Sequence, residues 1–436
     1  QTSDGWAPCR GLLGRLLQWL AALNCSVIML SATLPEAQRS ELLRAYGAMA
    51  APTQIAYPRV TLATGTYEEV APLPATSQRR VHLRHLASQG NLLCELLSQL
   101  DGGGCAAVVC NTVGGAQAMY RRLQRETSGA GVALSLMHGR YPQALREERE
   151  RHLLRCFGKE GERPAKAIVV ATQVVEQSLD LDFDLLVTEL APVDALLQRL
   201  GRLHRHERPR PPALQGPQAW FLAPPLDGDG LPDFGASAAV YDEYVLLRTW
   251  QLLQGRSGLM LPADTQPLVE ACYAPPDEAE LAGPLAVRLD AAAHRLQARL
   301  QAQVYASLRH ADGSPAAGGL AVGTAGAVAT RWDDLPALQV VCLQEHDGEC
   351  RIAGTSVCVR LEGPDGEAPG EEVVASLRRH AITIRGNVAL HDALLRARPE
   401  SWRRLPALQR LTPLLLDSEL TARLGDMRVR LDAELG

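Results

Sequence analysis

The chain has 436 residues, of which 46% are hydrophobic and 21% charged, and its formal net charge is −5. This size and composition are typical of a globular protein with roughly two or three domains. They exclude a uniformly basic nucleic-acid-binding protein, so any nucleic-acid site has to be a local basic strip. No apolar run approaches the roughly 20 residues that span a bilayer, which predicts a soluble, cytoplasmic protein without a membrane partner.

The first predicted elements are a helix and a strand. Leucines recur at helical spacing over residues 12–23, and the apolar run Val27–Leu30 predicts a short buried strand that leads into Ser31-Ala32-Thr33. Hydroxyls that follow such a strand lie at the carboxyl edge of a parallel sheet, where open α/β folds bind ligands. Residues 51–80 are rich in Pro and Thr and predict a linker with an irregular strand.

Residues 81–205 alternate strand patterns with helix patterns. The expected strands are Ala106–Cys110, Ala133–Met137, Ala167–Ala171 and Leu185–Glu189, and the expected helices span residues 90–100, 115–126, 143–156 and 194–204. Apolar strands separated by helices imply βαβ units with right-handed crossovers. The pattern therefore predicts an α/β fold with a RecA-like doubly wound parallel sheet.

The remainder is predicted as a helical region followed by a smaller mixed domain. A Pro-rich boundary at 207–217 precedes helical patterns over 238–274 and 283–304, and the Gly- and Ala-rich residues 313–327 predict a flexible loop. Short strand patterns then precede a mostly helical end, which makes an α+β C-terminal domain; these strand patterns lie at 338–343, 356–361 and 381–384.

The loop after the strand Ala167–Ala171 concentrates polar side chains. It carries Thr172 and Gln173, and ends in Ser-Leu-Asp-Leu-Asp, which includes Asp180. Hydroxyls and amides in such a loop can donate to a phosphodiester backbone, and a carboxylate can bind a ribose. The alternative is an ordinary polar loop that caps a helix.

The stretch Gln198–His206 is rich in cations. On a continuous helix Arg199, Arg202 and His206 fall at positions i, i+3 and i+7 and form a tight cationic face. Arg205, the residue before His206, lies beside this face. These like charges repel each other unless a bound anion compensates them. Planar guanidinium groups suit bidentate binding of phosphate, and an arginine placed against a γ-phosphate accelerates its transfer by roughly 10³–10⁵. The alternative is a solvated basic helix face.

These motifs, in this order, resemble motifs III, V and VI of superfamily 2 helicases. The sequence of the loop, Thr-Gln-Val-Val-Glu-Gln-Ser-Leu-Asp-Leu-Asp, resembles the corresponding motif of the CRISPR-associated helicase–nuclease of type I systems. Two stretches after the motor region, one beginning Val240-Tyr241 and the other Leu261-Pro262-Ala263-Asp264, are similar to that family as well. The resemblance runs from about residue 11 to the end of the chain and is strongest over 25–210.

The resemblance implies a role for each motif residue at a nucleotide cleft and a DNA channel. Arg202 and Arg205 would be arginine fingers, and Gln198 would also take part in catalysis. Asp180 would approach the nucleotide. Ser31 and Thr33 would couple the ATP state to the binding of DNA. The residues implied to contact single-stranded DNA are Asn111, Thr112, His138, Arg140, Thr172 and Gln173. For His138 a capping or core histidine is the alternative.

The family pattern is incomplete in this sequence. No G-x-x-x-x-G-K-[ST] phosphate loop is present, and no Asp-Glu pair for Mg²⁺ precedes Ser31. We therefore expect ATP and Mg²⁺ to be cofactors of the intact protein and the chain alone to be inactive, as a fragment that lacks the HD nuclease domain and most of the first RecA-like domain.

No metal site is expected in the chain itself. Ten cysteines form no C-x-x-C pair, and buried free thiols in a reducing compartment are the better interpretation. Two His-Asp dipeptides lack the further ligands that a dinuclear centre needs; they are His346-Asp347 and His391-Asp392.

The resemblance implies four parts and a set of partners. Residues 1–60 would be a remnant of the first RecA-like domain, 61–225 the second RecA-like domain, 226–310 a helical linker region and 311–436 an accessory domain. In the intact protein ATP would drive 3′-to-5′ movement on single-stranded DNA, after recruitment by the large subunit of a CRISPR surveillance complex. Two alternatives stay open: another superfamily 2 helicase, acting on RNA or in repair, and a non-catalytic module that binds single-stranded nucleic acid.

Overall fold

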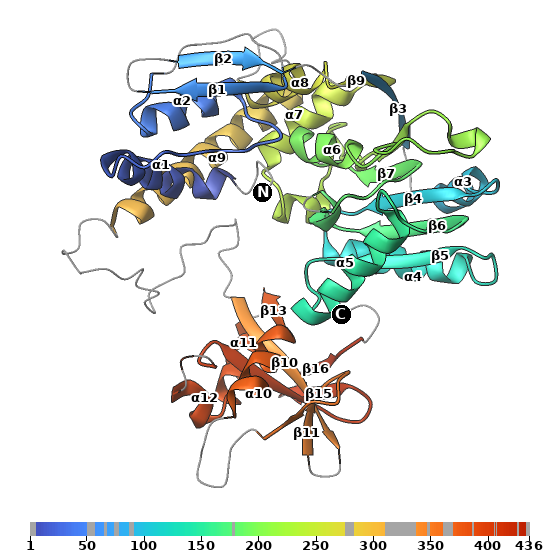
Figure 1. Cartoon of the computed structure of the whole chain (residues 1–436), viewed down its shortest axis with the longest axis vertical. Coiled ribbons are helices and arrows are strands. Elements are labelled where there is room, and N and C mark those ends of the chain that lie inside the picture. Colours follow the sequence, from blue (N-terminus) through green and yellow to red (C-terminus); the bar gives the residue numbers. More distant parts are fainter. Residues whose placement is uncertain are drawn as a thin grey trace. The chain divides into compact units, whose positions relative to one another are not determined.

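The computed structural model describes residues 6–49, 57–64, 68–73, 78–86, 91–176, 179–274, 283–309, 337–346, 349–360, 369–385, 388–404, 406, 408–424 and 427–432. The chain divides into two compact units (Figure 1). The first unit comprises residues 1–135 and 157–332, and the second comprises residues 136–156 and 333–436. The four-part division predicted from the sequence stays a prediction, as does the flexible loop at 313–327, which lies outside the described residues.

A seven-stranded sheet of order β5-β6-β4-β7-β8-β3-β9 is the framework that positions the motifs. The pairs β3–β8, β8–β7, β7–β4 and β4–β6 are parallel, and β9 runs antiparallel to β3. Every residue of β4 is buried, as expected for a parallel strand that is covered on both faces. The strands are β3 (Arg79–Leu86), β4 (Gly104–Val109), β5 (Ala133–Met137), β6 (Lys166–Ala171), β7 (Leu185–Glu189), β8 (Gln218–Leu222) and β9 (Gly258–Leu261).

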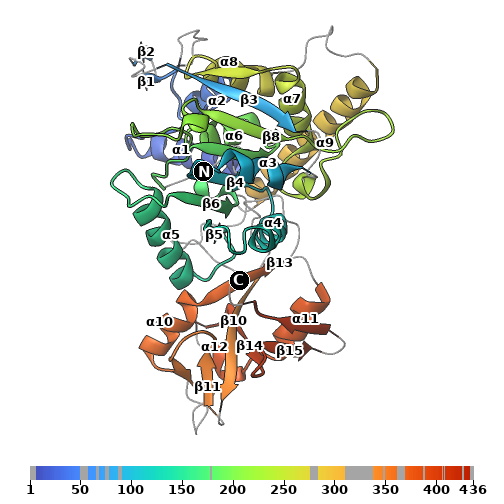
Figure 2. The ribbon, with the colours of Figure 1, turned by 90° about the vertical axis from the view of Figure 1, so that its right-hand side faces the viewer.

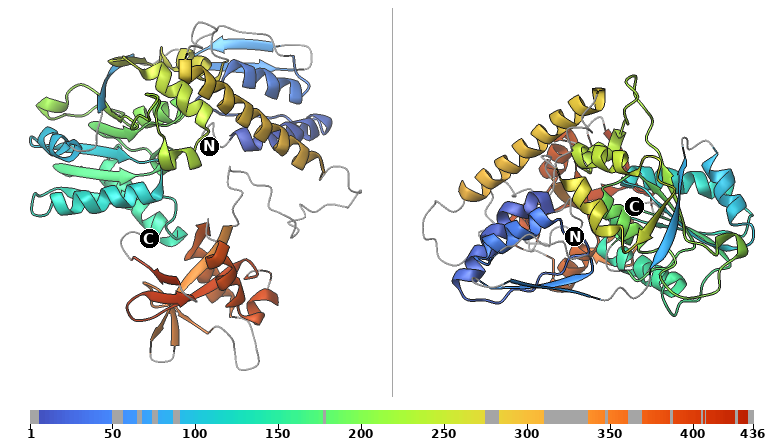
Figure 3. Two further views of the ribbon diagram at one scale, coloured as in Figure 1. Left: turned by 180° about the vertical axis from the view of Figure 1, so that it is seen from behind. Right: turned by 90° about the horizontal axis from the view of Figure 1, so that it is seen from above.

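Helices and a separate hairpin complete the first unit. The hairpin pairs β1 (Arg59–Ala63) with β2 (Glu68–Pro72). The long helix α9 lies beside α1 and α7 (Figure 3). The helices are α1 (Trp6–Ala22), α2 (Glu36–Ala45), α3 (Leu92–Gln99), α4 (Val113–Glu126), α6 (Val193–Leu200), α7 (Glu243–Leu253), α8 (Thr265–Tyr273) and α9 (Gly283–Arg309), and α5 (Gln143–Phe157) belongs almost wholly to the second unit.

The predicted α/β fold with a parallel sheet is confirmed. The four strands expected over 106–189 are β4, β5, β6 and β7, and the helices expected near 90–100, 115–126 and 143–156 are α3, α4 and α5. The hairpin β1–β2 and the start of β3 occupy described parts of the stretch that was expected to be a linker. Three strands of the sheet were not predicted, namely β3, β8 and β9.

The strand expected at Val27–Leu30 is wrong. These residues have no strand assignment, and the side chains of Ile28 and Leu30 are 88% and 92% exposed. A strand needs a hydrogen-bonding neighbour, and none of the described strands pairs with this segment. Apolarity therefore misled the prediction, because it indicates burial without supplying the neighbour.

Two helix predictions are wrong in their extent. The helix expected over 194–204 ends at Leu200. The single helical stretch expected over 238–274 is interrupted, because α7 stops at Leu253 and β9 intervenes before α8. Gly255 follows α7 with a left-handed φ of 70°, a conformation that ends helices and that glycine adopts without strain.

The second unit is built around the long strand β10 (Ala337–His346), which pairs antiparallel with β11 and β13 and parallel with β14. Alternate residues of β10 point into two cores: Val341 and Leu343 into one, Val340 and Cys342 into the other. Helices α10 and α11 lie on opposite sides of β10 (Figure 2). The other elements are β11 (Glu349–Ile352), β12 (Cys358–Val359), α10 (Glu371–Arg379), β13 (Ala381–Arg385), α11 (Val388–Arg396), α12 (Glu400–Arg404), β14 (Leu411–Leu416), β15 (Thr421–Leu424) and β16 (Met427–Arg430).

The predicted α+β character of the C-terminal part agrees with this arrangement, but the mostly helical end is wrong. After α12 the chain forms β14 and the hairpin β15–β16. The run Leu411–Leu416 becomes a strand because it pairs with β10, a partner about 70 residues earlier whose register the local sequence does not specify.

Two compositional expectations can be checked on the described residues. No helix in this part of the chain is both long and apolar enough to cross a bilayer. The thiols are free as expected, but their burial is mixed, because Cys25, Cys94 and Cys358 are exposed whereas Cys105, Cys110, Cys272 and Cys342 are buried.

Candidate nucleotide cleft and nucleic-acid loops

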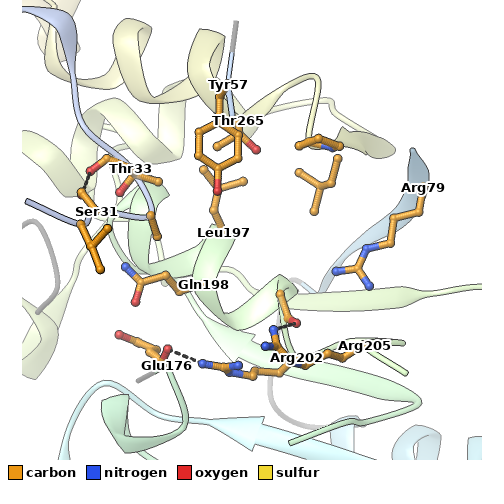
Figure 4. Close-up of a pocket in the computed structure, with 15 residues that line it drawn as sticks. Ser31, Thr33, Tyr57, Arg79, Glu176, Leu197, Gln198, Arg202, Arg205 and Thr265 are labelled. Carbon is orange, nitrogen blue, oxygen red and sulfur yellow. Dashed lines mark hydrogen bonds between the residues drawn. The ribbon is translucent and has the colours of Figure 1, made fainter. Parts of the chain in front are cut away.

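A cavity of about 510 Å³ in the first unit brings together residues from distant parts of the sequence (Figure 4). One side is formed by residues 30–33, and the other by the end of α6 and the turn that follows it. The lining residues are Leu30, Ser31, Ala32, Thr33, Tyr57, Arg79, Glu176, Leu197, Gln198, Gly201, Arg202, Arg205, Leu261, Pro262 and Thr265. Five of the predicted site residues therefore face a common space, namely Ser31, Thr33, Gln198, Arg202 and Arg205.

Ser31 and Thr33 form a local turn at the cavity. The Ser31 hydroxyl donates to the carbonyl of Thr33 at 2.6 Å, and Thr33 is nearly buried whereas Ser31 is exposed. The pair therefore presents one accessible hydroxyl to the cavity. Their predicted role in coupling stays a prediction.

Three polar side chains reach the cavity from α6 and from the segment that follows it, namely Gln198, Arg202 and Arg205. Gln198 lies on the last turn of α6, and both arginines lie in the turn beyond it. Gly201 begins this turn, and a Cβ there would lie 3.0 Å from the carbonyl oxygen of Gln198. A larger residue would therefore be in tight contact with the last turn of the helix, which would have to shift by a few tenths of an ångström.

Arg202 is held by the loop after β6. Its Nε donates to the carbonyl of Val175 at 2.9 Å, and its Nη2 donates to the carbonyl of Glu176 at 2.8 Å. Burial and the neighbouring charge of Arg205 lower the pKa of Arg202, with Asp180 and Glu176 acting in the opposite direction. The Arg202 cation therefore lacks full compensation, and an anion in the cavity would relieve this cost.

Arg205 is exposed and pairs with Asp180. The guanidinium Nε contacts Asp180 Oδ1, and this hydrogen bond is the main cause of the lowered pKa of Asp180. Asp180 does not line the cavity, so it contacts the cavity residues through Arg205. The structure thus brings these two predicted nucleotide-binding residues together, but as partners of each other.

The buried carboxylate of Asp182 fixes the backbone of the turn. Asp182 Oδ1 accepts from the backbone N–H of Arg205 at 2.7 Å, and its two oxygens also pair with the guanidinium groups of Arg163, Arg208 and Arg210. Burial by itself would raise the pKa of Asp182, but hydrogen bonding and charge from Arg210 and Arg163 outweigh it and lower the pKa. Asp182 therefore stays ionised and anchors the segment that carries Arg205.

The predicted cationic helix face is wrong. The helix ends before Arg202, and Arg199 points into the protein with no exposed surface. The Arg199 guanidinium pairs with Glu176 at 2.8 Å and donates to Thr188, Asn111 and Tyr241 at 2.7, 3.0 and 3.1 Å. Arg199 is thus separated from the other two arginines of the motif, which both line the cavity.

Two predicted nucleic-acid residues, Asn111 and Gln173, belong to the same buried network. The Asn111 amide donates to the carbonyl of Leu190 and the hydroxyl of Ser237 at 2.6 and 2.9 Å, and Asn111 is 2% exposed. Gln173 is half-buried, and its amide donates to the carbonyl of Asn111 at 2.7 Å. Direct contact of the Asn111 side chain with DNA would require these bonds to open, whereas Gln173 keeps some exposed surface.

Thr112 and Thr172 occupy positions that precede helical turns. The Thr112 hydroxyl accepts from the backbone N–H of Gly115 at 3.0 Å and caps α4. Thr172 is 2% exposed and precedes the short 3₁₀ turn Gln173–Val175. Both residues therefore have structural positions, and their contact with DNA stays a prediction.

His138 and Arg140 lie after β5, in the part of the chain assigned to the second unit. His138 is fully buried and stacks on Tyr141 with ring centroids 3.9 Å apart. Its Nδ1 lies 3.3 Å from the backbone N–H of Arg140, whose residue is exposed. The geometry favours the core-histidine alternative for His138 and leaves Arg140 as the accessible member of the pair.

Arg79 is a cavity residue that the sequence did not reveal. It lies at the start of β3, and its guanidinium donates to the carbonyls of Leu200, Leu203 and His204 at the end of α6 and in the turn. A cation is favourable at the C-terminus of a helix, where carbonyls lack partners. No local motif marks this role, because all three acceptors lie more than 120 residues further along the chain.

The donor set fits the phosphates of a nucleotide better than a metal ion. Arg202, Arg205 and Gln198 supply cationic or amide N–H groups around one cavity. Within the described residues no group of three His, Cys, Asp or Glu side chains could hold a metal ion.

Comparison with known proteins places this geometry in a family. Two family models match: "CRISPR-associated nuclease/helicase Cas3, C-terminal" over residues 102–208 and "Cas3 C-terminal domain" over residues 333–436. The CRISPR-associated endonuclease/helicase Cas3 of Thermus thermophilus is 33% identical over 98% of this chain and 52% of its own length. The Cas3 of Escherichia coli is 36% identical over 63% of this chain and 32% of its own length.

Solved structures agree with the sequence comparisons. The crystal structure of T. fusca Cas3 with ATP matches with a TM-score of 0.81 and 29% identity, over 99% of this chain and 52% of that one. A chain of a CRISPR RNA-guided surveillance complex in a pre-nicking state matches with a TM-score of 0.77 and 26% identity, over 98% of this chain and 55% of that one. This chain thus spans about half the length of the Thermus thermophilus relative and of these two structures, and the match covers about a third of the Escherichia coli relative. It belongs to the Cas3 family of CRISPR-associated helicase–nucleases, within the C-terminal part of that family.

Proposed function

We propose that the chain supplies the second RecA-like half of an ATP-driven, 3′-to-5′ single-stranded DNA helicase–nuclease of type I CRISPR interference. The observation that carries this proposal is the cavity in which Ser31 faces Gln198 and Arg202. An ATPase cleft between two RecA-like halves needs cations on one side that act on phosphates held from the other. This chain provides that cationic side.

The nucleotide end of the mechanism rests on two arginines. ATP, when bound with Mg²⁺, would supply the phosphoryl group whose transfer to water releases energy. Arg202 is already oriented by two carbonyls and would meet the phosphate charge with little loss of side-chain entropy. Arg205 would have to leave Asp180 to do the same, which makes it the finger whose position depends on the nucleotide.

The nucleic-acid end rests on the loop after β6. Gln173 is half-buried and keeps some exposed surface beside the buried network, and Thr112 ends the connection from β4 to α4. In the second unit, exposed Arg140 lies in the connection between β5 and α5. Binding by such groups would be directed at the backbone, sensitive to salt and indifferent to sequence. The large recruiting subunit of a surveillance complex is the proposed protein partner, an idea supported by the relative found in such a complex.

Two measurements on the purified chain test the proposal. Fluorescence anisotropy should show binding to the single strand dT20, weaker at higher salt, with no preference for rU20. Incubation with ATP and Mg²⁺ should give no phosphate release above background, because the chain has no phosphate loop. Selective affinity for the RNA would favour an RNA helicase instead, and steady ATP turnover by the chain alone would contradict the assignment of a half cleft.

A further inference from the structure

The hydroxyl of Tyr241 sits between the two motifs that the proposed function connects. Tyr241 is 3% exposed and lies just before α7, outside the motif sequences themselves. Its oxygen accepts from Gln173 Nε2 at 3.0 Å and from Arg199 Nη2 at 3.1 Å. One phenolic oxygen thus contacts the nucleic-acid loop after β6 and the helix that carries Gln198.

These two bonds close a buried ring with Asn111. Gln173 donates to the backbone carbonyl of Asn111, and Arg199 donates to its side-chain oxygen at 3.0 Å. Hydrogen bonds in such an enclosed, low-dielectric network reinforce each other, so a shift of one member changes the geometry of the others. Without the Tyr241 oxygen, Gln173 would contact Arg199 through Asn111, and the loop would still be joined to α6 by the Glu176–Arg199 pair.

The backbone of Tyr241 is itself fixed by the residues that follow it. The Asp242 carboxylate caps α7 by accepting from the N–H of Tyr244 at 2.9 Å. Glu243 pairs with Arg288 and Arg295 of α9 at 2.8 and 2.7 Å. Because α7 is held by its own cap and by α9, the phenol has a defined position against which the loop and α6 can be aligned.

We propose that Tyr241 is a positioning residue that couples Gln173, in the loop after β6, to Arg199 of α6, in addition to the ion pair between Glu176 and Arg199. A strand that contacts Gln173 would then change the dynamics of the turn that carries Arg202 and Arg205, through Arg199. The inference rests on the proposed function, because it assumes that the loop binds single-stranded DNA. It assigns the link to a residue outside the motor motifs.

The test uses the whole 436-residue chain and the variant Tyr241→Phe, which removes only the hydroxyl. Fluorescein-labelled dT20 reports binding by anisotropy, and hydrogen exchange of the backbone amides at 199–206 is measured with and without dT20. Tyr244→Phe is the matched control, because its hydroxyl donates to the carbonyl of Ala274 and contacts neither Gln173 nor Arg199 through that bond. Circular dichroism confirms that both variants remain folded.

We expect dT20 to slow exchange at 199–206 by about threefold or more in the unsubstituted chain and in Tyr244→Phe. In Tyr241→Phe the affinity for dT20 should stay within about twofold, while this response falls by about half or more, since the Glu176–Arg199 pair remains. The same response in Tyr241→Phe, or no response in the unsubstituted chain despite binding, overturns the coupling while leaving the proposed function intact. No binding of dT20 by the unsubstituted chain removes the proposed function, and the inference with it. If Tyr241→Phe does not fold, Tyr241→Met, which also lacks the hydroxyl and leaves Gln173 in place, is used and must weaken the same response.

Discussion

Replacement of Glu176 by alanine should destabilise the first unit by about 3–5 kcal/mol, the usual cost of removing one partner of a buried ion pair. The side chains of Glu176 and Arg199 are both 0% exposed, and Glu176 Oε1 lies 2.8 Å from Arg199 Nε. After the substitution Arg199 keeps its bonds to Thr188, Asn111 and Tyr241, but these acceptors are neutral. They satisfy the guanidinium N–H groups without compensating the buried positive charge.

Calorimetric unfolding of the purified chain provides the measurement. At roughly 2 °C per kcal/mol for a large unit, the first transition of Glu176→Ala should move down by about 6–10 °C. Glu95→Ala is the control, because its ion pair with Arg84 lies in the same unit but is 34% and 51% exposed. An exposed pair contributes less than about 1 kcal/mol, so the control should move by at most about 2 °C. Equal shifts in the two variants would refute the reasoning, since burial would then not set the cost.

Two further predictions concern other buried groups. The pKa of Asp182 is lowered in the folded state, so the stability that its carboxylate contributes is present above about pH 4 and is lost as the pH falls through the folded-state pKa. The melting temperature of Asp182→Asn should therefore lie below that of the unsubstituted chain at pH 7 and approach it between about pH 4 and pH 2; a constant gap would contradict this. Trp402 is completely buried in the second unit, and Trp402→Ala should cost that unit about 3–5 kcal/mol in a urea titration, whereas Trp19→Ala, at a position that is 61% exposed, should leave the second unit unchanged.

The predicted strands of the sheet contain short apolar runs. β4, β6 and β7 are largely apolar and buried, as expected for central parallel strands, and the partly buried β5 also has a short apolar pattern. β3 reads Arg-Arg-Val-His-Leu-Arg-His-Leu, with exposed polar side chains between buried ones, so its place next to β8 is set by pairing that the local sequence does not encode. Val27–Leu30 shows the reverse case, an apolar run without a described neighbour.

The candidate site also contains residues that the sequence motifs indicated and residues that they did not. The motifs led to Ser31, Thr33, Gln198, Arg202 and Arg205, which line one cavity, and the roles assigned to them stay predictions. The contacts of Arg79 and Tyr241 were not predicted, because each side chain bonds to atoms that are distant in sequence, although Val240-Tyr241 belongs to a stretch that resembles the family. Sequence reasoning therefore identified residues at the surface of the site and missed those that hold them in place.

The three arginines of the motif show why spacing by itself does not assign function. Arg199, Arg202 and Arg205 recur every third residue, yet the helix ends after the first of them, so each side chain has a different environment. Arg199 is a buried structural cation whose counter-ion is Glu176. Arg202 lines the cavity and is oriented by backbone carbonyls, whereas Arg205 is exposed and pairs with Asp180. Loss of Arg199 should therefore lower the melting temperature of the first unit by more than loss of the exposed Arg205 does. The distinction lies in burial and partners, which a linear repeat of arginines does not contain.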